Sequence, residues 1–346
     1  MGQAASLELL PRNRLHGIVM GAEADFYRVR LVESELTLLC VCRARLQKTA
    51  QQVLVGDRVI VEPDWSGQRG AIEEILPRFS HLSRPAIANI DQVLVVFALA
   101  EPQLDEYLLS RFLVKAETTG LAVNLCLTKA DLVSETDQRR WQERLRTWGY
   151  QPICISLVTQ SGLEQIRAVL GDRTSVLAGP SGVGKSRLTN SLIPGLDLSV
   201  AAVSGKLQKG RHTTRHVQLY HLPSGGLLAD TPGFNQAEID CLPQELIRYF
   251  PESHHIQQPC QYHNCSHRHE PNCAVRGDWE RYNHYLNFLQ ELEASRDRYR
   301  PETGLKIKHK GGKVVHEPRL AAKKYRRTSR RNQHQILQGS LQEEEY

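Results

Sequence analysis

A glycine-rich octapeptide, Gly-Pro-Ser-Gly-Val-Gly-Lys-Ser at 179–186, has the residue types needed to bind phosphate. It matches the pattern Gly-x-x-x-x-Gly-Lys-Ser in full, between a predicted strand (174–178) and a predicted helix (185–192). Its glycines let successive backbone N–H groups form an anion nest at the positive end of a helix. The side chain of Lys185 would reach the β- and γ-phosphates, and Ser186 would ligate Mg²⁺. The residues expected to contact the nucleotide here are Gly179, Pro180, Ser181, Gly182, Val183, Gly184, Lys185, Ser186 and Arg187.

A second motif, Thr128-Lys129-Ala130-Asp131, closes a predicted strand (121–127) and would choose the base. An Asp carboxylate accepts hydrogen bonds from both N1 and the exocyclic amino group of guanine. Adenine lacks that donor pair, so Asp131 would select GTP over ATP. Lys129 would pack along the base, and the backbone of Ser156-Leu157 would offer an N–H to the guanine oxygen. Asn is commoner than Thr at position 128, and a surface helix cap at Asp131 is the alternative for the tetrapeptide alone.

Two further segments suit the magnesium side of such a site. Asp230-Thr231-Pro232-Gly233 follows a predicted strand (227–229), so Asp230 would hold Mg²⁺ through water and Gly233 would offer its N–H to the γ-phosphate. Gly210–Thr214 lies between this motif and the phosphate loop, where a segment could be ordered by γ-phosphate and Mg²⁺. We favour Thr214 over Thr213 as the sensing hydroxyl and magnesium ligand. An ordinary flexible loop is the alternative.

The position after Gly233 is Phe234, where many GTPases place a glutamine that orients the attacking water. His212 is the nearest candidate in sequence for that task, and an external partner is the other. Slow hydrolysis by the isolated protein follows as an expectation. The candidate catalytic residues are therefore His212, Thr214 and Lys185.

A Cys/His cluster, Cys260-x₄-Cys265-x-His267-x₅-Cys273, places three thiolates and an imidazole close together in sequence. Such a set suits a closed tetrahedral zinc site, one per chain, with no open position for catalysis. The neighbouring histidines could compete as the fourth ligand; they are His254, His255, His263 and His269. Unrelated reduced cysteines are the alternative.

The hydrophobic pattern divides the chain into four regions. Residues 1–84 contain five short predicted strands (16–19, 26–31, 36–42, 58–62 and 70–75), typical of a closed barrel of the oligonucleotide-binding (OB) type or of a generic β-barrel. Residues 85–240 alternate strands with helices, which predicts a doubly wound α/β P-loop domain. Residues 241–300 hold the Cys/His cluster and a predicted helix (279–298), giving an α-helical zinc-binding subdomain. Residues 301–346 are expected to form a basic, flexible tail.

Net charge and composition restrict the partners and the compartment that this protein is expected to have. The net charge is +6, but residues 296–334 carry 14 Lys/Arg against 3 Asp/Glu, a local +11 that leaves −5 for the rest. A basic tail on an acidic body suggests an arm that binds polyanions, and a solvated tail is the alternative. No apolar run approaches the roughly 20 residues that span a bilayer, and no secretory signal is evident, so we expect a cytoplasmic protein. The remaining cysteines fit a reducing compartment.

Taken together, the motifs resemble the RsgA family, also called YjeQ or YloQ. The loops Thr128–Asp131, Gly179–Ser186, Gly210–Thr214 and Asp230–Gly233 occur in that family's circularly permuted order, with the base-reading loop before the phosphate loop. The resemblance covers about residues 15–300, including the barrel and the spacing of the Cys/His cluster. It departs at Thr128, where the family usually has Asn, and in the long basic extension.

The resemblance implies a GTPase of late small-subunit maturation. Such a protein binds the small ribosomal subunit and its rRNA in the GTP state, hydrolyses GTP to GDP and phosphate when the subunit stimulates it, and is then released. Mg²⁺ and Zn²⁺ are the implied metals, and the family's suspected catalytic histidine falls on His212. We expect a monomer with no membrane partner. Two other readings are an RNA-binding assembly scaffold whose nucleotide is mainly structural, and an ATP-dependent phosphotransferase, against which Asp131 argues.

Overall fold

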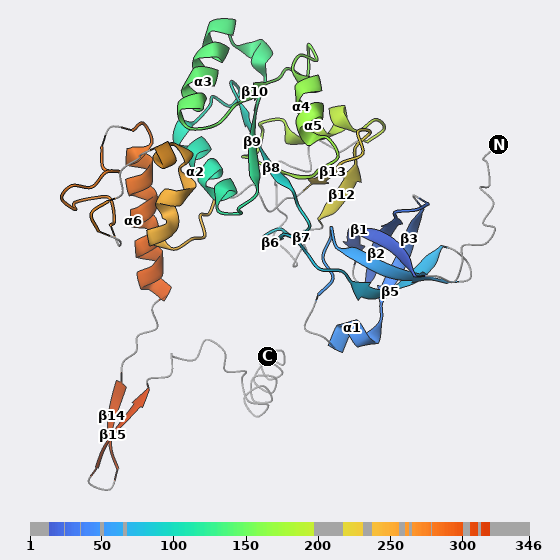
Figure 1. The fold of residues 1–346 in the computed structure, drawn as a ribbon, viewed down its shortest axis with the longest axis horizontal. Coiled ribbons are helices and arrows are strands. Elements are labelled where there is room, and N and C mark those ends of the chain that lie inside the picture. The colour runs from blue at the N-terminus through green and yellow to red at the C-terminus, as the bar shows by residue number, and fades with distance from the viewer. Residues whose placement is uncertain are drawn as a thin grey trace, which may run out of the picture. The chain divides into compact units, whose positions relative to one another are not determined.

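The computed structural model describes residues 14–23, 25–34, 36–48, 52–64, 68–196, 217–230, 237–255, 260–262, 265–277, 279–299, 305–310 and 313–318. The chain divides into two compact units, Met1–Leu289 and Gln290–Tyr346. Helices and strands of both are drawn in Figure 1.

A closed five-stranded barrel forms the N-terminal part of the first unit. Its strands are β1 (Leu15–Glu23), β2 (Phe26–Leu31), β3 (Thr37–Cys42), β4 (Arg58–Pro63) and β5 (Arg69–Ile75), and the short helix α1 (Ala44–Lys48) follows β3. The strand order is β1-β2-β3-β5-β4, and β4 pairs back onto β1, which closes the barrel. Alternate residues such as Val19, Val29 and Val59 fill its interior. The predicted OB-type barrel is confirmed.

A short hairpin joins the barrel to the rest of the unit, and the sequence pattern did not predict it. It consists of β6 (His81–Ser83) and β7 (Ala86–Ala88). The fully buried carboxylate of Asp57 accepts two hydrogen bonds from Arg78, at 2.6 and 2.8 Å. The Asn89 amide donates to the Gly56 carbonyl at 3.0 Å. The connection is therefore built from ion-paired and hydrogen-bonded side chains.

The central domain is a mainly parallel sheet with helices on both faces. Its strands are β8 (Gln92–Ala98), β9 (Ala122–Thr128), β10 (Ile153–Cys154), β11 (Thr174–Ala178), β12 (Gln218–His221) and β13 (Leu227–Asp230). The order is β10-β9-β8-β11-β13-β12, with only β12 antiparallel within this part. Every residue of β8 is buried, as expected for a central parallel strand. The predicted α/β domain is confirmed.

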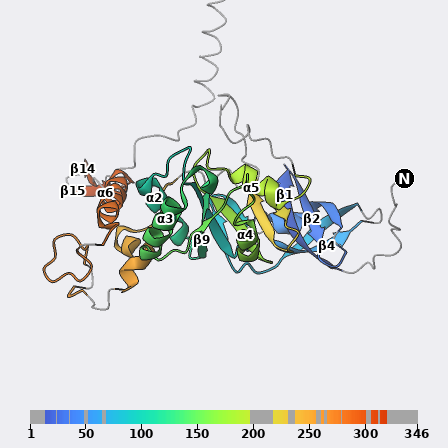
Figure 2. The same ribbon diagram turned by 90° about the horizontal axis from the view of Figure 1, so that it is seen from above.

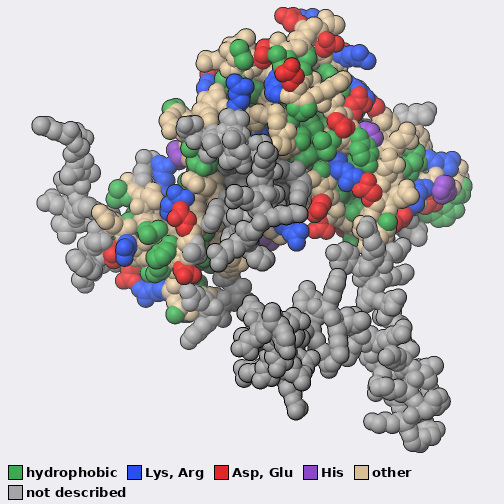
Figure 3. Space-filling model, turned by 180° about the vertical axis from the view of Figure 1, so that it is seen from behind, with side chains coloured by type: hydrophobic (Ala, Val, Ile, Leu, Met, Phe, Trp, Pro, Cys, Tyr) green, Lys and Arg blue, Asp and Glu red, His purple; other side chains and the backbone are tan. Residues whose placement is uncertain are grey.

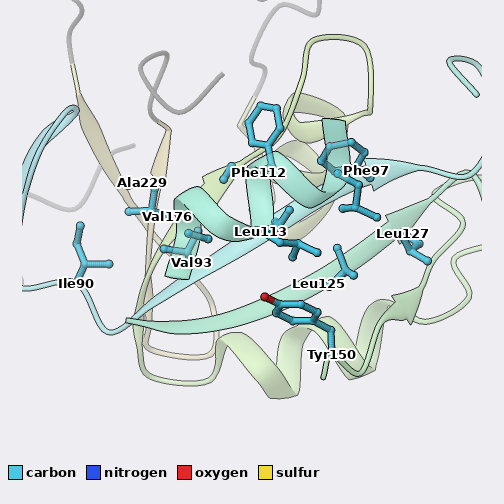
Figure 4. Packing of buried hydrophobic residues seen from close by; sticks show 14 of the residues in the cluster. Ile90, Val93, Phe97, Phe112, Leu113, Leu125, Leu127, Tyr150, Val176 and Ala229 are labelled. Atoms are coloured by element: carbon cyan, nitrogen blue, oxygen red, sulfur yellow. The ribbon is translucent and has the colours of Figure 1, made fainter. Parts of the chain in front are cut away.

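Helices cover each face of this sheet and form two apolar cores. The helices are α2 (Glu106–Glu117), α3 (Glu135–Thr147), α4 (Leu163–Leu170) and α5 (Lys185–Leu192). One core contains side chains of α2 and α3, and Figure 4 shows Phe112 and Leu113 of α2 packed over Val93, Leu125 and Val176 of the strands. The other core contains side chains of α4 and α5. Asp105 and Ser134 cap α2 and α3 by accepting N–H groups of the first turn.

The Cys/His unit (residues 241–289) follows the sheet. It contains the 3-10 helices Pro243–Tyr249 and Pro251–His255 and the start of α6 (Tyr282–Tyr299). The helix predicted at 279–298 is thus confirmed with a later start. Among the described helices, none has the length and apolar character to cross a bilayer.

The segment expected to be a flexible tail contains a hairpin. Strands β14 (Leu305–Lys310) and β15 (Lys313–Pro318) pair antiparallel from Leu305↔Pro318 to Lys310↔Lys313. This hairpin lies within the segment expected to be a basic, flexible tail, and the flexibility of that segment stays a prediction. Alternating apolar and basic residues around Gly311-Gly312 were the available signal, since Gly-Gly favours two-residue hairpin turns.

Candidate functional site

The phosphate loop follows β11 and leads into α5. Gly179 has φ +143°, and a Cβ there would lie 2.1 Å from the backbone oxygen of Val96 in β8. Only glycine allows this close approach of loop and strand. Gly184, with φ +98°, is the residue that precedes the first turn of α5. The loop therefore has the backbone conformation that directs N–H groups of a helix start toward an anion.

Lys185, the one charged residue of the motif, begins α5 and turns its side chain back onto the loop. Its ammonium donates to the carbonyls of Gly179 and Pro180, at 2.7 and 2.6 Å. Ser186 is half-buried in the first turn of α5, while Arg187 is exposed. Lys185 and Ser186 are thus the first two residues of α5, directly after the loop, and their roles toward phosphate and Mg²⁺ stay predictions.

The base-reading loop contacts the phosphate loop directly. Thr128 ends β9, and its buried hydroxyl lies 2.5 Å from the carbonyl of Val183 and 3.2 Å from that of Phe97 in β8. The hydroxyl has one proton, so these two carbonyls share it. Thr128, which stands where Asn is commoner, therefore connects β8, β9 and the phosphate loop through its hydroxyl.

Lys129 and Asp131 extend from the same loop. Lys129 has a left-handed backbone (φ +57°), and its ammonium donates to the carbonyl of Glu101 in the loop after β8. Asp131 is exposed, on a single 3-10 turn (Ala130–Leu132). The amide of Gln138 in α3 donates to the Ala130 carbonyl at 2.9 Å and holds this turn. The Asp131 carboxylate is therefore presented to solvent from a fixed backbone.

The loop after β10 completes this end of the site. The buried Ser156 hydroxyl accepts from the N–H groups of Val158 and Thr159, at 3.2 and 3.1 Å. The N–H of Ser156 itself donates to Ser161. Ser156 therefore shapes the loop, and the N–H of Leu157 becomes the candidate donor to the guanine oxygen.

The sheet topology explains why these loops meet. They follow β8, β9, β10 and β11, which run parallel, so all of them leave the carboxyl edge of the sheet. The chain moves outward from β8 to β10 and then returns to β11 beside β8. Ligands of such sheets bind at the point where the strand order reverses, which here is between β8 and β11.

The magnesium side of the predicted site is only partly described. Asp230 ends β13, next to β11, and pairs with Gln218 of β12. His212, Thr214 and Gly233 lie outside the described residues. Their roles stay predictions.

The Cys/His cluster is assembled as its spacing predicted. The ligand atoms of Cys260, Cys265, His267 and Cys273 all lie within 4.8 Å of one another. Nδ1 of His267 lies 3.5 Å from the Cys260 sulfur and 3.4 Å from the Cys273 sulfur. Burial lowers the pKa of His267, which favours the neutral imidazole that binds metals. Three thiolates and one imidazole fit a soft tetrahedral ion.

Neighbouring groups hold the backbone of this cluster. The Glu270 carboxylate accepts N–H groups from Ser266 and Arg268 at 2.6 and 3.1 Å. The hydroxyls of Tyr282 and Tyr285 in α6 donate to the carbonyls of His267 and Ser266. Helix α6 therefore fixes the ligand loop from outside the ligand set, as metal sites commonly require.

The Cys/His unit packs on α2 and α3 through residues that sequence reasoning missed. Arg281 is fully buried, donates to Glu252 at 2.6 Å, and lies 4.8 Å from the ring centroids of Trp148 and Phe250. Glu280 accepts from Trp148 Nε1 at 2.7 Å and pairs with Arg144 of α3. No local pattern marks such residues, because their partners are more than a hundred positions away in α3 or across a loop.

A family model and the curated relatives that resemble this chain carry the same family name, RsgA. Residues 75–240 match the family model described as RsgA GTPase. A protein of Nostoc sp. named small ribosomal subunit biogenesis GTPase RsgA 1 is 53% identical over 98% of this chain and 100% of its own. An Arabidopsis thaliana protein named small ribosomal subunit biogenesis GTPase RsgA 1, mitochondrial, is 40% identical over 94% of this chain and 86% of its own.

Two solved structures agree with the fold. YjeQ from Thermotoga maritima superposes with a TM-score of 0.71 at 33% identity, covering 81% of this chain and 99% of that one. YloQ, described as a circularly permuted GTPase, superposes with a TM-score of 0.69 at 33% identity, covering 85% of this chain and 100% of that one. The permuted order of the loops is thus shared with a structure that bears that description.

Proposed function

This chain belongs to the RsgA family of ribosome-biogenesis GTPases, and we propose that it binds the small ribosomal subunit and its rRNA in the GTP state. The subunit stimulates hydrolysis to GDP and phosphate late in maturation, and release follows. The observation that carries this proposal is the contact between Thr128 and Val183, which brings the base-reading loop and the phosphate loop to one edge of the sheet.

Recognition of the nucleotide is assigned to the two joined loops. Asp131 accepts from the guanine N1 and amino group, and Lys129 flanks the base. The backbone N–H groups of Gly179–Gly184 and the Lys185 ammonium hold the phosphates. Ser186, Asp230 and Thr214 would hold Mg²⁺, which when bound neutralises charge on the β- and γ-phosphates.

Water activation is assigned to His212, because Phe234 stands where many GTPases have a glutamine. A histidine on a segment that the phosphates must first order would act slowly in the isolated protein. The ribosomal subunit would then fix that segment and raise the turnover rate. This dependence on a partner distinguishes a timed switch from a housekeeping hydrolase.

The Cys/His cluster is assigned one structural zinc ion. Its donors are soft, and its four protein ligands leave no position for a substrate. Glu270, Tyr282 and Tyr285 hold the ligand loop as described above. The ion would thus stabilise the unit without taking part in hydrolysis.

The barrel and the basic C-terminal segment are assigned to rRNA. OB-type barrels bind oligonucleotides on their strands and loops, and the local charge of +11 over residues 296–334 attracts phosphates. The described surface in Figure 3 mixes acidic and basic side chains, so on that face no single-sign field stands out. Outside residues 296–334 the net charge is −5, so the charge that attracts RNA would come chiefly from the C-terminal segment.

The decisive measurement is multiple-turnover GTP hydrolysis with and without purified small subunits, for the wild type and His212→Ala. We expect slow turnover alone, a large increase with subunits, and loss of that increase in the variant. An RNA-binding scaffold with a structural nucleotide would bind subunits but show no turnover. Competition between GTP and ATP, with GTP winning, tests the role of Asp131.

A further inference from the structure

The barrel strand β1 continues past the barrel into the nucleotide-binding sheet. Its Gly21 pairs with Gln218, the first residue of β12, so barrel and sheet share one set of strands. Figure 2 shows β1 beside the yellow strands of this sheet. An edge strand of the GTPase sheet is therefore covered by a strand of the candidate RNA-binding barrel.

A β-bulge makes this second pairing possible. In the β1–β2 ladder, Val19 pairs with Val29 and Gly21 with Arg28, so Met20 is an extra residue on β1. The N–H and carbonyl of Val19 bond to the Gly56-Asp57 turn at 2.9 and 2.8 Å. A bulge bends its strand and redirects its pairing. Here the bulge at Met20 lies between Val19, which bonds to the Gly56-Asp57 turn, and Gly21, which pairs with β12.

Side chains reinforce the backbone pairing. Ile18, Met20 and Ala22 alternate on the outer side of β1 and pack against the core beneath α2 and α3. Val217, adjacent to β12, packs against the same core, and Leu219 is part of it. The β1 side chains and the start of β12 therefore share one core, through which a displacement of β1 would be transmitted, because interiors are close-packed.

The start of β12 lies one strand away from Asp230. Gln218 pairs with Gly21 on one side and with Asp230 on the other. Two strand spacings, about 10 Å, thus separate the barrel backbone from the backbone of the predicted magnesium residue. The predicted first switch, Gly210–Thr214, joins β12 at this end, and the predicted second switch, Asp230–Gly233, leaves β13 at the same end.

We propose that strand β1, through Met20 and the row Gly21–Gln218–Asp230, is a positioning element that couples the barrel to both nucleotide-sensing segments. A polyanion held by the barrel would bias the β12–β13 hairpin, and the nucleotide state would in turn alter β1, because coupling between two sites is reciprocal. The proposal rests on the proposed function, since it takes the segments beside Asp230 to sense GTP.

Reciprocity allows a test without ribosomes. Amide hydrogen exchange of the full chain is compared with Mg²⁺·GDP and with Mg²⁺ and a non-hydrolysable GTP analogue. We expect peptides of β1 (15–23) to differ in exchange by about 5-fold or more between the two nucleotides, the lower end of common coupling factors. Peptides of β3 (37–42), which does not pair with β12, are the internal control and should match.

Variants of Met20 test whether the coupling between β1 and β12 passes through side-chain packing. Met20→Ala should abolish most of the nucleotide-dependent difference in β1, and Met20→Leu, which keeps the volume, should retain it. Val32→Ala, an exposed position of the same barrel, should behave as wild type. Thermal melting of each variant checks that the barrel is folded, and only the difference between nucleotides is scored.

The outcomes separate the two proposals. If both nucleotides bind but β1 exchanges equally with each, the coupling is wrong and the GTPase assignment stands. The coupling is also wrong if Met20→Ala keeps the full difference. If neither nucleotide binds, both fail. A difference in β1 that Met20→Ala removes and Met20→Leu preserves supports the coupling.

Discussion

Arg281→Ala is expected to lower the free energy of unfolding by about 3–5 kcal/mol, the range for breaking one partner of a buried ion pair. Arg281 is 0% exposed and its partner Glu252 only 9%. The substitution leaves the Glu252 carboxylate buried without its cation. It also removes a guanidinium that stacks between Trp148 and Phe250, each with its ring centroid at 4.8 Å.

The large expected loss of stability arises because the Arg281–Glu252 pair is buried, since an exposed ion pair contributes little. Arg139→Ala is the matched control, because Arg139 pairs with Glu135 in α3 with both side chains mostly exposed, at 74% and 83%. An exposed pair of this spacing is worth about 0.3–0.5 kcal/mol. The two arginine deletions should therefore differ roughly tenfold in cost.

Urea unfolding followed by tryptophan fluorescence measures both variants. With a slope of about 3 kcal/mol per molar urea, Arg281→Ala should lower the midpoint by about 1–1.7 M. The double variant Arg281→Met/Glu252→Met should be more stable than Arg281→Ala, because it leaves no buried charge unpaired. The reasoning is refuted if Arg281→Ala costs under about 1 kcal/mol, or if the coupling energy of a double-mutant cycle with Glu252 is below about 0.5 kcal/mol.

Other changes test the nucleotide and metal sites. Asp131→Asn should weaken GDP binding about 10- to 150-fold and improve xanthosine diphosphate binding relative to GDP, as measured by fluorescent-nucleotide displacement. Gly179→Ala, whose Cβ would lie 2.1 Å from a backbone oxygen of β8, should weaken GDP binding at least about 10-fold, whereas Gly195→Ala, with open space around its Cβ, should bind GDP normally. Cys273→Ser should lower zinc affinity, measured by competition with a chelator, by more than the roughly 10- to 100-fold that loss of an outer-shell partner costs, and unchanged affinity would contradict the ligand assignment. Burial, followed by a neighbouring guanidinium, lowers the pKa of His284, so wild-type stability should fall as pH drops below about 6.5, and His284→Phe should remove that part of the pH dependence.

Elements with strong local patterns could be predicted from the sequence. The five barrel strands are short runs rich in strand-forming residues, of which Phe26–Leu31 alternates apolar and polar residues, and β8 is a continuous apolar run, so each was predicted within a few residues of its observed bounds. The bulge at Met20 and the pairing of Gly21 with Gln218 could not be predicted. The pairing joins segments nearly two hundred residues apart, and the bulge is a register shift in the β1–β2 ladder that no residue pattern marks, because single strands do not encode their neighbours.

The site divides in the same way. Gly179–Ser186 and Thr128–Asp131 were found because their chemistry requires fixed residue types at fixed spacing. Glu101 was missed because it contributes a backbone carbonyl, which any residue could supply. Arg281 was missed because a basic residue near a helix start reads as solvated, and only the packing of Trp148 and Phe250 around it reveals its burial.

Each half of the nucleotide-binding sheet contacts a different part of the protein, and the two halves follow one another in the permuted chain order. The base-reading half, β8 to β10, comes first, and its helices α2 and α3 carry the Cys/His unit through Glu106, Arg144 and Glu280. The phosphate half, β11 to β13, comes last, and its edge strand β12 pairs with the barrel. Loss of the contacts to guanine should therefore change the packing of the Cys/His unit more than that of the barrel. Loss of the γ-phosphate should change the packing of the barrel more than that of the Cys/His unit. Because the two routes use different helices and strands, Glu280→Ala should leave the nucleotide response of β1 unchanged, and Met20→Ala should leave the Cys/His unit docked.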